Sequence, residues 1–255
     1  MTLRDLGTAG FASASDVYER GRPGYPDALI SELATRRPRS AEWRAADVAA
    51  GTGKLARQLQ AAGARTVAVE PSASMRAEGR RASPSTAVVA GSAEALPFST
   101  GTFDLVAVAQ AFHWFEPAPA LHEMARILRP GGVLALVWNE RETGPAWTVE
   151  LNRIMHGAGD APHQPVDQLR RTFDGDLHFT AFSRWTGHHD VAMDASEVED
   201  MVASRSYVRV LAEHDRRSVL AQVRRLIASL PRPLVMPYTT VAYCAEVRPG
   251  PCPCR

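Results

Sequence analysis

Lysine is almost missing from this chain of 255 residues: Lys54 is the only one, and arginine supplies the remaining cationic charge. The 29 lysine and arginine residues face 28 aspartate and glutamate residues, which leaves a formal net charge of +1. A chain so close to neutral has no field that would favour nucleic acid or an anionic membrane surface as a partner. We interpret the preference for arginine as a bias of genome composition.

Cysteine and long apolar runs are scarce too. The three cysteines are too few for a disulfide framework. Cys244 lies in an apolar run and is expected to be buried, whereas Cys252 and Cys254 lie in a proline-rich end, residues 248–255, which we expect to be a flexible tail without a metal. No run reaches the roughly 18 apolar residues of a membrane span. Residues 1–14 do not resemble a signal peptide and are expected to be flexible, so we expect a cytoplasmic protein.

The most informative segment is the glycine-containing stretch from Asp47 to Gly53. An apolar run leads into it, and a helix is expected to follow at Lys54. A second apolar run then ends at Glu70. This order of strand, glycine turn, helix, strand and acid is half of a mononucleotide-binding unit.

Three kinds of site share that outline. A P-loop would need a glycine where Val48 stands and a hydroxyl where Leu55 stands, so that interpretation fails. A dinucleotide site fits the spacing from Gly51 to Glu70. In an S-adenosylmethionine site, Asp47 would face the cationic end of the ligand and Glu70 the ribose hydroxyls. Asp47 favours this last interpretation, because a carboxylate before the turn repels a pyrophosphate and attracts an ammonium group.

The pattern beyond this unit alternates strands with helices, which indicates an α/β fold with a parallel sheet and helices on both faces. After Asn139 the pattern predicts one or two helices within 145–174, a sixth strand through Phe179 and Val191, two more helices, and a last strand over 238–247. A helical insertion before the final strand fits this order better than two independent domains. The strands are predicted near 44–49, 65–70, 86–90, 103–109 and 132–138, and the helices at 54–62, 72–82 and 117–128.

Five stretches in order resemble class I S-adenosylmethionine-dependent methyltransferases. The resemblance is to the small-molecule branch (methyltransferase type 11), which includes trans-aconitate methyltransferase and the enzymes of ubiquinone and menaquinone biosynthesis. It covers residues 15–140, and it is looser in the C-terminal half, where Ser204–Val208 and the last strand carry it. The five stretches are Tyr18–Pro26; Asp47–Gly53; Val69–Ser72 with Met75; Gly91–Phe98 running into Phe103–Val106; and Gln110–Phe115 followed by Arg129–Gly132.

This resemblance implies a Rossmann-like fold with a seven-stranded, mostly parallel sheet. It also implies a single domain over 15–247, with a cofactor-binding half at 15–140, substrate-side helices and the insertion at 141–235, and the last strand at 236–247. The family pattern usually has glycine where this chain has Ala49. Because alanine resists positive φ angles, we expect a slightly displaced loop that still binds.

The resemblance also assigns the candidate site residues. Several have plainer alternatives: Met75 as core, Glu94 as a surface acid, Gln110 as a strand cap, and His113 as a packed histidine in place of a general base. The cofactor residues are Tyr18, Arg22, Asp47, Ala49, Gly51, Gly53, Glu70, Pro71, Met75, Ala93, Glu94 and Gln110. The substrate-side residues are Tyr25, Trp114, Trp138, Arg141, Arg205 and Tyr207.

Methyl transfer from S-adenosylmethionine to an oxygen, nitrogen or carbon atom of a small molecule, such as a carboxylate or a natural-product intermediate, is therefore the predicted function. A nicotinamide-dependent oxidoreductase and a catalytically silent S-adenosylmethionine-binding protein remain the alternatives. No nucleic acid, membrane or metal is expected, and the oligomeric state stays open. His178, His188 and His189 have no third ligand at metal-site spacing and are expected to face solvent.

Overall fold

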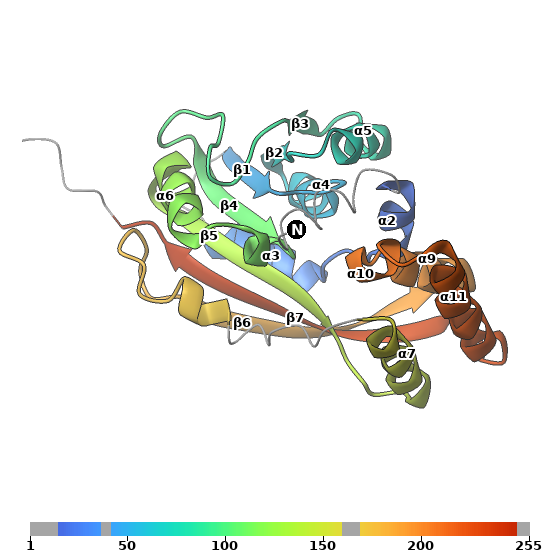
Figure 1. Ribbon diagram of the computed structural model, residues 1–255. Coiled ribbons are helices and arrows are strands. Elements are labelled where there is room, and N and C mark those ends of the chain that lie inside the picture. Colours follow the sequence, from blue (N-terminus) through green and yellow to red (C-terminus); the bar gives the residue numbers. More distant parts are fainter. Residues whose placement is uncertain (1–14, 37–41, 160–168, 249–255) are drawn as a thin grey trace, which may run out of the picture.

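A computed structural model of the protein describes residues 15–36, 42–159 and 169–248 (Figure 1). Seven strands form one sheet in the order β3-β2-β1-β4-β5-β7-β6. The first five strands run parallel, and β7 runs antiparallel to both β5 and β6. The strands are β1 (Trp43–Val48), β2 (Ala64–Val69), β3 (Ala87–Val89), β4 (Phe103–Ala109), β5 (Leu128–Arg141), β6 (Ser183–Met193) and β7 (Leu234–Glu246).

Helices cover both faces of the sheet (Figure 1). They are α2 (Ser15–Gly21), α3 (Asp27–Arg36), α4 (Lys54–Ala61), α5 (Ala73–Ala82), α6 (Pro117–Ile127), α7 (Ala146–Gly157), α9 (Ala195–Ala203), α10 (Ser206–Arg209) and α11 (Glu213–Ala228), with short 3₁₀ turns at Phe112–Trp114 and Arg170–Thr172.

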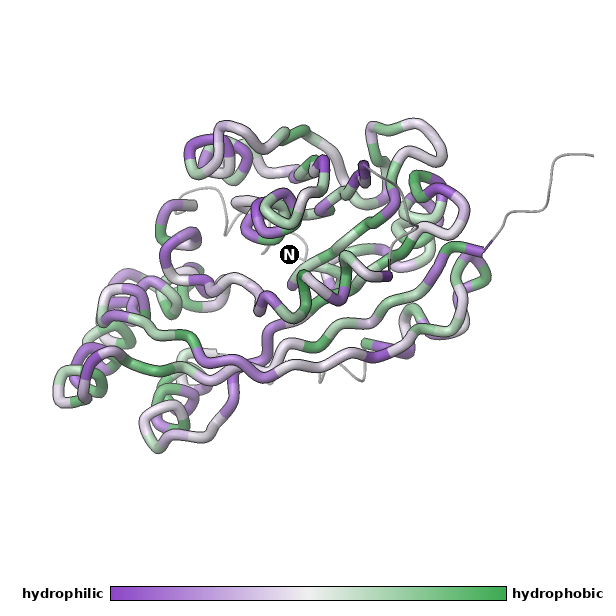
Figure 2. The backbone as a smooth tube through the Cα atoms, turned by 180° about the vertical axis from the view of Figure 1, so that it is seen from behind, coloured by the Kyte–Doolittle hydropathy of each residue, from purple (hydrophilic) through white to green (hydrophobic). Residues whose placement is uncertain are grey.

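The central strands are buried on both faces, as the nearly continuous apolar sequence of a parallel sheet requires. Successive residues of a strand point to opposite faces. Accordingly Leu105 packs with the leucines of α3 and α4, while Val106 packs with α6. Figure 2 shows these strands as the hydrophobic interior between more polar helices.

A third hydrophobic cluster joins α7, α9 and α11 to the first residues of β7. We call these helices together with α10 the cap helices; α9 and α11 lie side by side at one end of the molecule (Figure 1). Helix α9 begins at a capping box, in which Asp194 Oδ1 accepts a hydrogen bond from Glu197 N at 2.8 Å and Asp194 N donates to Glu197 Oε2 at 2.8 Å. Such a box satisfies two backbone groups at the helix start, so it fixes where α9 begins.

The predicted strands and helices of residues 43–138 are confirmed to within a few residues, and so is the seven-stranded, mostly parallel fold class. The fifth strand begins earlier than predicted because it also pairs with β4 before a register shift. Phe103 pairs with Leu128 on one side of the shift, and Leu105 pairs with Val133 on the other. Phe179 lies outside the sixth strand, where it forms an isolated bridge with Val247.

Cys244 is buried, and burial raises the pKa of its thiol to about 11, as expected for a structural cysteine. The proposed flexible segments 1–14 and 249–255, including Cys252 and Cys254, lie outside the described residues. Within the described part of the chain, every helix is too short or too polar to cross a bilayer. The division of the domain into 15–140, 141–235 and 236–247 stays a prediction.

Candidate active site

The order of the strands reverses between β1 and β4, and ligands of open α/β sheets bind at the carboxyl ends of strands beside such a switch point. The glycine turn lies there. Gly53 N donates to Ala50 O at 2.8 Å, and Ala50 N donates to Val69 O at 3.0 Å, so the turn is tied to β2. Ala49 has a φ of 55° and Gly51 a φ of 58°, both in the left-handed region. Ala49 therefore adopts the conformation that a glycine would adopt without strain.

Glu70 follows β2 and holds the turn from the side. Its Oε2 accepts a hydrogen bond from Gly51 N and its Oε1 one from Ser72 N, both at 2.9 Å. The side chain is 7% exposed, and burial raises the pKa of the carboxyl against the effect of these two bonds. A carboxylate accepts about four hydrogen bonds, so acceptor capacity remains for two ligand hydroxyls.

Asp47 lies beneath the turn with 1% of its surface exposed. Its Oδ2 accepts from Ala56 N at 2.9 Å, which fastens the first turn of α4. Its Oδ1 is buried without a hydrogen-bond partner among the described residues. Burial, together with the nearby Glu70 charge, raises the pKa of Asp47 to about 7. A cationic group nearby would stabilise the ionised form and use the unsatisfied oxygen.

The segment from Arg22 to Pro26, which we call the strap, joins α2 to α3 and is tied on both sides. On one side Tyr25 N donates to Gln58 Oε1 at 2.9 Å, and Gln58 Nε2 donates to Tyr25 O at 2.6 Å. On the other side Asn139 Nδ2 donates to Gly24 O at 2.9 Å. Burial raises the pKa of the Tyr25 phenol, and the Asp47 charge adds to that effect, which places Tyr25 near the buried acid.

Helix α2 leads into the strap and covers the turn. The Tyr18 ring lies against Gly51, 3.6 Å from where a Cβ on that glycine would stand. Glu19 Oε1 bonds Arg57 Nη2 at 2.5 Å and Lys54 Nζ at 3.4 Å, so α2 is held to the start of α4 by ion pairs. The turn is therefore enclosed by α2 above and Asp47 below.

Gln110 ends β4 beside the turn and has a φ of 58°. Its backbone N donates to Val137 O at 2.8 Å and its Nε2 to Asn139 O at 2.9 Å, so it fastens β4 to β5. His113 follows and is exposed, with its ring 4.7 Å from that of Trp114. Trp114 packs partly against the core.

The remaining cofactor candidates follow β2 and β3. Met75 is 2% exposed on α5, and Ala93 is 4% exposed. Pro71 is exposed, and its carbonyl accepts from Arg76 Nη1 at 2.7 Å. Glu94 is half-buried, and its Oε1 accepts from Glu116 N at 3.3 Å, at the start of α6. Glu94 thus ties the segment after β3 to the residue that precedes α6.

The substrate-side candidates of β5 lie on opposite faces of the sheet. Trp138 is 4% exposed and packs edge-on against Tyr243 in the core. Arg141 lies on the side of the cap helices, where its Nη1 is 3.0 Å from Met155 Sδ and 3.6 Å from Met201 Sδ. Of the two, only Arg141 therefore lies beside the cap helices.

Arg22, Arg205 and Tyr207 come together between α2 and the cap helices. The Arg22 guanidinium lies over the Tyr18 ring, 5.1 Å from its centroid. Burial and the Arg205 charge lower the pKa of Arg22 to about 10, and Tyr207 opposes that effect. All three side chains are half-buried. The strap arginine and the cap residues thus form one polar group at this junction.

The expectation that His189 faces solvent is wrong. Its ring stacks on Tyr238 at 5.7 Å, its Nδ1 is 3.4 Å from Thr240 Oγ1, and its Nε2 is buried. Burial lowers the pKa of this imidazole. Burial alternates along β6, and His189 is on the same face as Trp185 and Val191. This alternation of apolar and polar residues could have predicted that His189 points inward. The sequence did not indicate Gln58 and Asn139 as site residues, because they hold the strap, a segment distant from both in sequence.

The other two histidines pair with acids: His178 Nδ1 lies 3.0 Å from Asp176 Oδ1, and His188 Nδ1 lies 2.6 Å from Glu142 Oε1. Within residues 15–36, 42–159 and 169–248, no three His, Cys, Asp or Glu side chains are grouped so that they could hold a metal ion.

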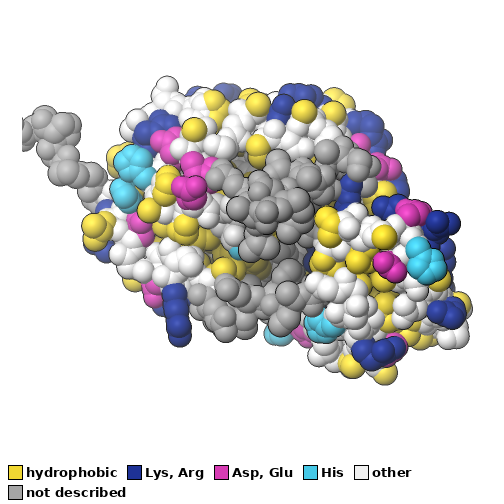
Figure 3. Space-filling view, in the orientation of Figure 1, with side chains coloured by type: hydrophobic (Ala, Val, Ile, Leu, Met, Phe, Trp, Pro, Cys, Tyr) yellow, Lys and Arg dark blue, Asp and Glu magenta, His cyan; other side chains and the backbone are white. Residues whose placement is uncertain are grey.

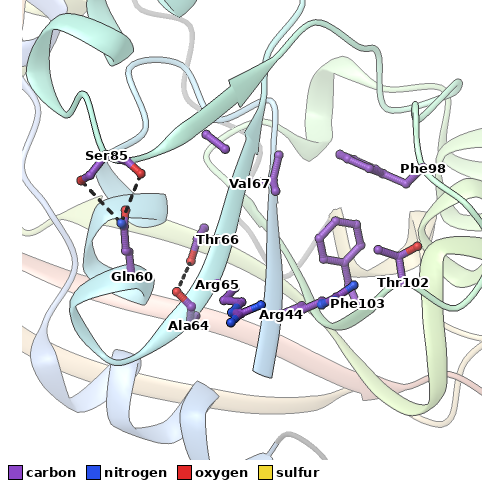
Figure 4. A pocket seen from close by; sticks show the side chains of 11 residues that line it. Arg44, Gln60, Ala64, Arg65, Thr66, Val67, Ser85, Phe98, Thr102 and Phe103 are labelled. Atoms are coloured by element: carbon purple, nitrogen blue, oxygen red, sulfur yellow. Dashed lines mark hydrogen bonds between the residues drawn. The ribbon is translucent and has the colours of Figure 1, made fainter. Parts of the chain in front are cut away.

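A surface groove of about 500 Å³ lies at the opposite end of the sheet (Figure 4). Arg44, Thr66 and Phe103, near the starts of β1, β2 and β4, line it. None of the candidate site residues lines this groove, and the rule for open α/β sheets favours the carboxyl ends of the strands. We therefore take the glycine turn, and not this groove, as the candidate site.

Residues 46–136 match the methyltransferase domain family. The chain is 38% identical over 247 residues to an uncharacterized methyltransferase of Mycobacterium tuberculosis, covering 93% of this chain and 95% of that one. It is 33% identical over 152 residues, 59% of this chain and 57% of the relative, to a malonyl-[acyl-carrier protein] O-methyltransferase of Enterobacter lignolyticus. A solved structure of a candidate type II methyltransferase from Anaeromyxobacter dehalogenans superposes with a TM-score of 0.68 at 24% identity, covering 90% of this chain and 99% of that one.

The chain belongs to the class I methyltransferases, a family of S-adenosylmethionine-dependent enzymes. The similarity to the mycobacterial protein covers 93% of this chain and so extends well beyond residues 46–136.

Proposed function

We propose that this protein binds S-adenosylmethionine at the glycine turn and transfers its methyl group to a small-molecule acceptor. The observation that carries the proposal is the pair of acids around the turn. Asp47 keeps a buried oxygen without a partner, and Glu70 keeps acceptor capacity at the end of β2. Together they suit a ligand with a cationic end and a ribose.

In this proposal each residue binds or orients. Glu70 accepts hydrogen bonds from the ribose hydroxyls, and Asp47 faces the cationic amino-acid end of the ligand. Tyr18 and Gly51 enclose that end, while Met75 and the backbone of Ala93 lie toward the adenine. Gln110 and Trp114 stand beside the acceptor.

The chemistry asks little of the protein beyond alignment. S-adenosylmethionine supplies an activated methyl group, and as the acceptor atom bonds to that carbon the carbon–sulfur bond breaks with its electron pair going to sulfur. Holding donor and acceptor in line and excluding water supplies roughly 7–11 kcal/mol of the barrier reduction. We assign that task to the strap and α2.

The acceptor is proposed to be a small molecule in the cytoplasm. The partial similarity to an O-methyltransferase supports an oxygen acceptor. The interspersed basic and acidic side chains on the face shown in Figure 3 do not resemble the basic stripe of a nucleic-acid-binding surface.

His113 is the candidate general base. An imidazole removes a proton from a protonated acceptor near neutral pH and contributes roughly a hundredfold or more. A carboxylate acceptor would need no base. We therefore expect His113→Ala to lower kcat by about a hundredfold for a hydroxyl or amine acceptor. An unchanged kcat would reject the base role and favour an acceptor that is already ionised.

The test is turnover. The protein is incubated with S-adenosylmethionine and a panel of carboxylic acids, phenols and amines, and S-adenosylhomocysteine release is followed by mass spectrometry. We expect release together with a product one methyl group heavier, and much slower release with Glu70→Ala at the same cofactor concentration. A protein that binds S-adenosylhomocysteine yet releases none with any acceptor would be a silent binding protein.

A further inference from the structure

Two cationic side chains at the junction of α2 and the cap helices have no acidic partner among the residues that the structure describes. The Nε–H groups of Arg22 and Arg205 are both buried and donate no hydrogen bond to any of the described residues. In the described part of the chain, neither guanidinium takes part in an ion pair. By contrast, the neighbouring Arg20 bonds Asp200 at 2.6 Å, and Arg57 bonds Glu19 at 2.5 Å.

The fold brings these two arginines together through a close backbone contact. A Cβ on Gly21 would lie 2.3 Å from Met201 N, so the end of α2 touches α9 directly. Arg22 is the next residue after Gly21, and Arg205 lies one helical turn beyond Met201. Tyr238 fixes the same place from the sheet, since its hydroxyl is 3.7 Å from Met201 Sδ.

Burial of an unpaired charge is expensive, because the guanidinium loses water without gaining a counter-ion. The two charges also repel each other, which the lowered pKa of Arg22 reflects. That pKa, about 10, still leaves the group charged at neutral pH. The Tyr18 ring offsets part of the cost for Arg22 by a cation–π contact. An anion bound between the two arginines would offset much more.

We propose that Arg22 and Arg205 together bind a carboxylate, and that this carboxylate belongs to the methyl acceptor. Planar guanidinium groups bind carboxylates through paired hydrogen bonds, and two of them converging would select an acidic acceptor over a neutral one. The inference rests on the proposed function and names the substrate class of that site.

The same chemistry has a second source, the α-carboxylate of the cofactor. We assign the site to the acceptor because Arg205 comes from the cap, between α9 and α10, whereas the proposed cofactor contacts come from the ends of β1, β2 and β4. Arg22 lies between the two regions, since it packs on Tyr18, which covers Gly51. Arg205 is therefore the residue whose removal separates the two sources.

The experiment uses acetate, the smallest suitable carboxylate, as the probe. The chain of 255 residues is first titrated with S-adenosylhomocysteine and then saturated with it. Its Tm is then followed as sodium acetate replaces sodium chloride at constant ionic strength. The variants are Arg22→Gln and Arg205→Gln. The control is Arg217→Gln, an arginine of α11 whose side chain is 72% exposed.

We expect acetate to raise the Tm of the wild-type protein and of the control along a saturating curve. In Arg205→Gln the acetate affinity should fall by about tenfold or more, with S-adenosylhomocysteine affinity within about threefold of wild type. Equal acetate responses in all variants, or no response in the wild type, would overturn the proposal. A loss of S-adenosylhomocysteine affinity in Arg205→Gln would assign the carboxylate to the cofactor and also overturn it. Failure of the wild type to bind S-adenosylhomocysteine at all would refute the proposed function, a separate result.

Discussion

Ala49 and Gln110 both carry positive φ angles although neither is glycine, and they follow neighbouring strands on the two sides of the switch point. Residues in such conformations cost free energy that the surrounding structure must supply, and they concentrate at functional sites. Gln110 is held by two hydrogen bonds to β5. Ala49 leads into the glycine turn, where a bend of the chain brings the backbone toward the proposed ligand.

Replacing Ala49 with glycine should stabilise the protein. The left-handed conformation costs an alanine roughly 1–2 kcal/mol, and glycine removes this cost. Glycine also gives the unfolded chain more conformational freedom, which lowers the stability of the folded protein by about 0.4–1 kcal/mol. We expect Ala49→Gly to raise the free energy of unfolding by about 0.5–1 kcal/mol in chemical denaturation. Ala50→Gly is the matched control, because Ala50 is not among the described residues with positive φ, and it should lower that free energy. Equal effects of the two variants would show that Ala49 is not strained.

Asp47 should make ligand binding depend on pH. Its pKa is about 7 in the free protein, and a cationic ligand binds the ionised form more tightly. The affinity for S-adenosylhomocysteine, whose amino group is cationic, should therefore rise by roughly tenfold between about pH 6 and about pH 8. Isothermal titration measures this affinity. In Asp47→Asn the dependence should flatten, and a wild-type affinity that falls as pH rises would contradict the role.

The same carboxyl affects folding with a definite sign. Its pKa is raised from 3.8 in the unfolded chain to about 7 in the folded one, so between those values the folded chain holds a proton that the unfolded chain has released. Its contribution to the free energy of unfolding is fully present below the lower value and is lost as pH rises through about 7. A bound cationic ligand would reverse this loss by stabilising the ionised carboxylate.

The strap is held to α4 and to β5 by a few polar contacts. Gln58 holds Tyr25 by two hydrogen bonds, and Asn139 holds Gly24 by one. Because these bonds join backbone to side chains distant in sequence, they set the position of the strap without contributing much hydrophobic packing. A segment held mainly by a few hydrogen bonds can open without unfolding of the core, at a lower free energy than global unfolding requires.

Gln58→Ala should loosen the strap without unfolding the protein. We expect faster amide hydrogen exchange over residues 22–26 and a several-fold weaker affinity for S-adenosylhomocysteine, with little change in Tm. Gln60→Ala, on the same helix but bonded to Thr86, serves as the control and should leave the strap unchanged. Equal exchange over the strap in both variants would show that Gln58 does not hold it.

The elements differ in how well local sequence specifies them. Strands β1, β2 and β4 and helix α4 follow from apolar runs and one glycine turn, so their positions were predicted closely. The extension of β5 back to Leu128 depends on pairing with β4, which local sequence does not contain. The inward position of His189 likewise depends on how β6 pairs with β7.

The candidate site shows the same division. Asp47, Gly51 and Glu70 lie within one strand–turn–helix–strand unit, and their proximity could be predicted from spacing. Arg22 and Arg205 are 183 positions apart by their numbers, and only the contact between α2 and α9 reveals that they converge. The sequence indicated each arginine separately as a candidate but could not show that the two side chains lie at the same junction.

In the molecule as a whole, the sheet carries the glycine turn and the two acids, and α2 and the strap connect this part to the cap helices (Figure 1). In the account proposed above, the cofactor binds on one side of α2 and the acceptor is selected on the other. The two functions should therefore respond to different substitutions: Glu70 and Asp47 for the cofactor, Arg205 for the acceptor.

Isothermal titration of the purified chain with S-adenosylhomocysteine and, separately, with NAD⁺ tests the central claim most directly. We predict one S-adenosylhomocysteine per chain, binding weakened by at least about tenfold in Glu70→Ala but not in the exposed control Glu42→Ala, and no heat from NAD⁺. Binding of NAD⁺, or S-adenosylhomocysteine binding to Glu70→Ala with wild-type affinity, would contradict the assignment.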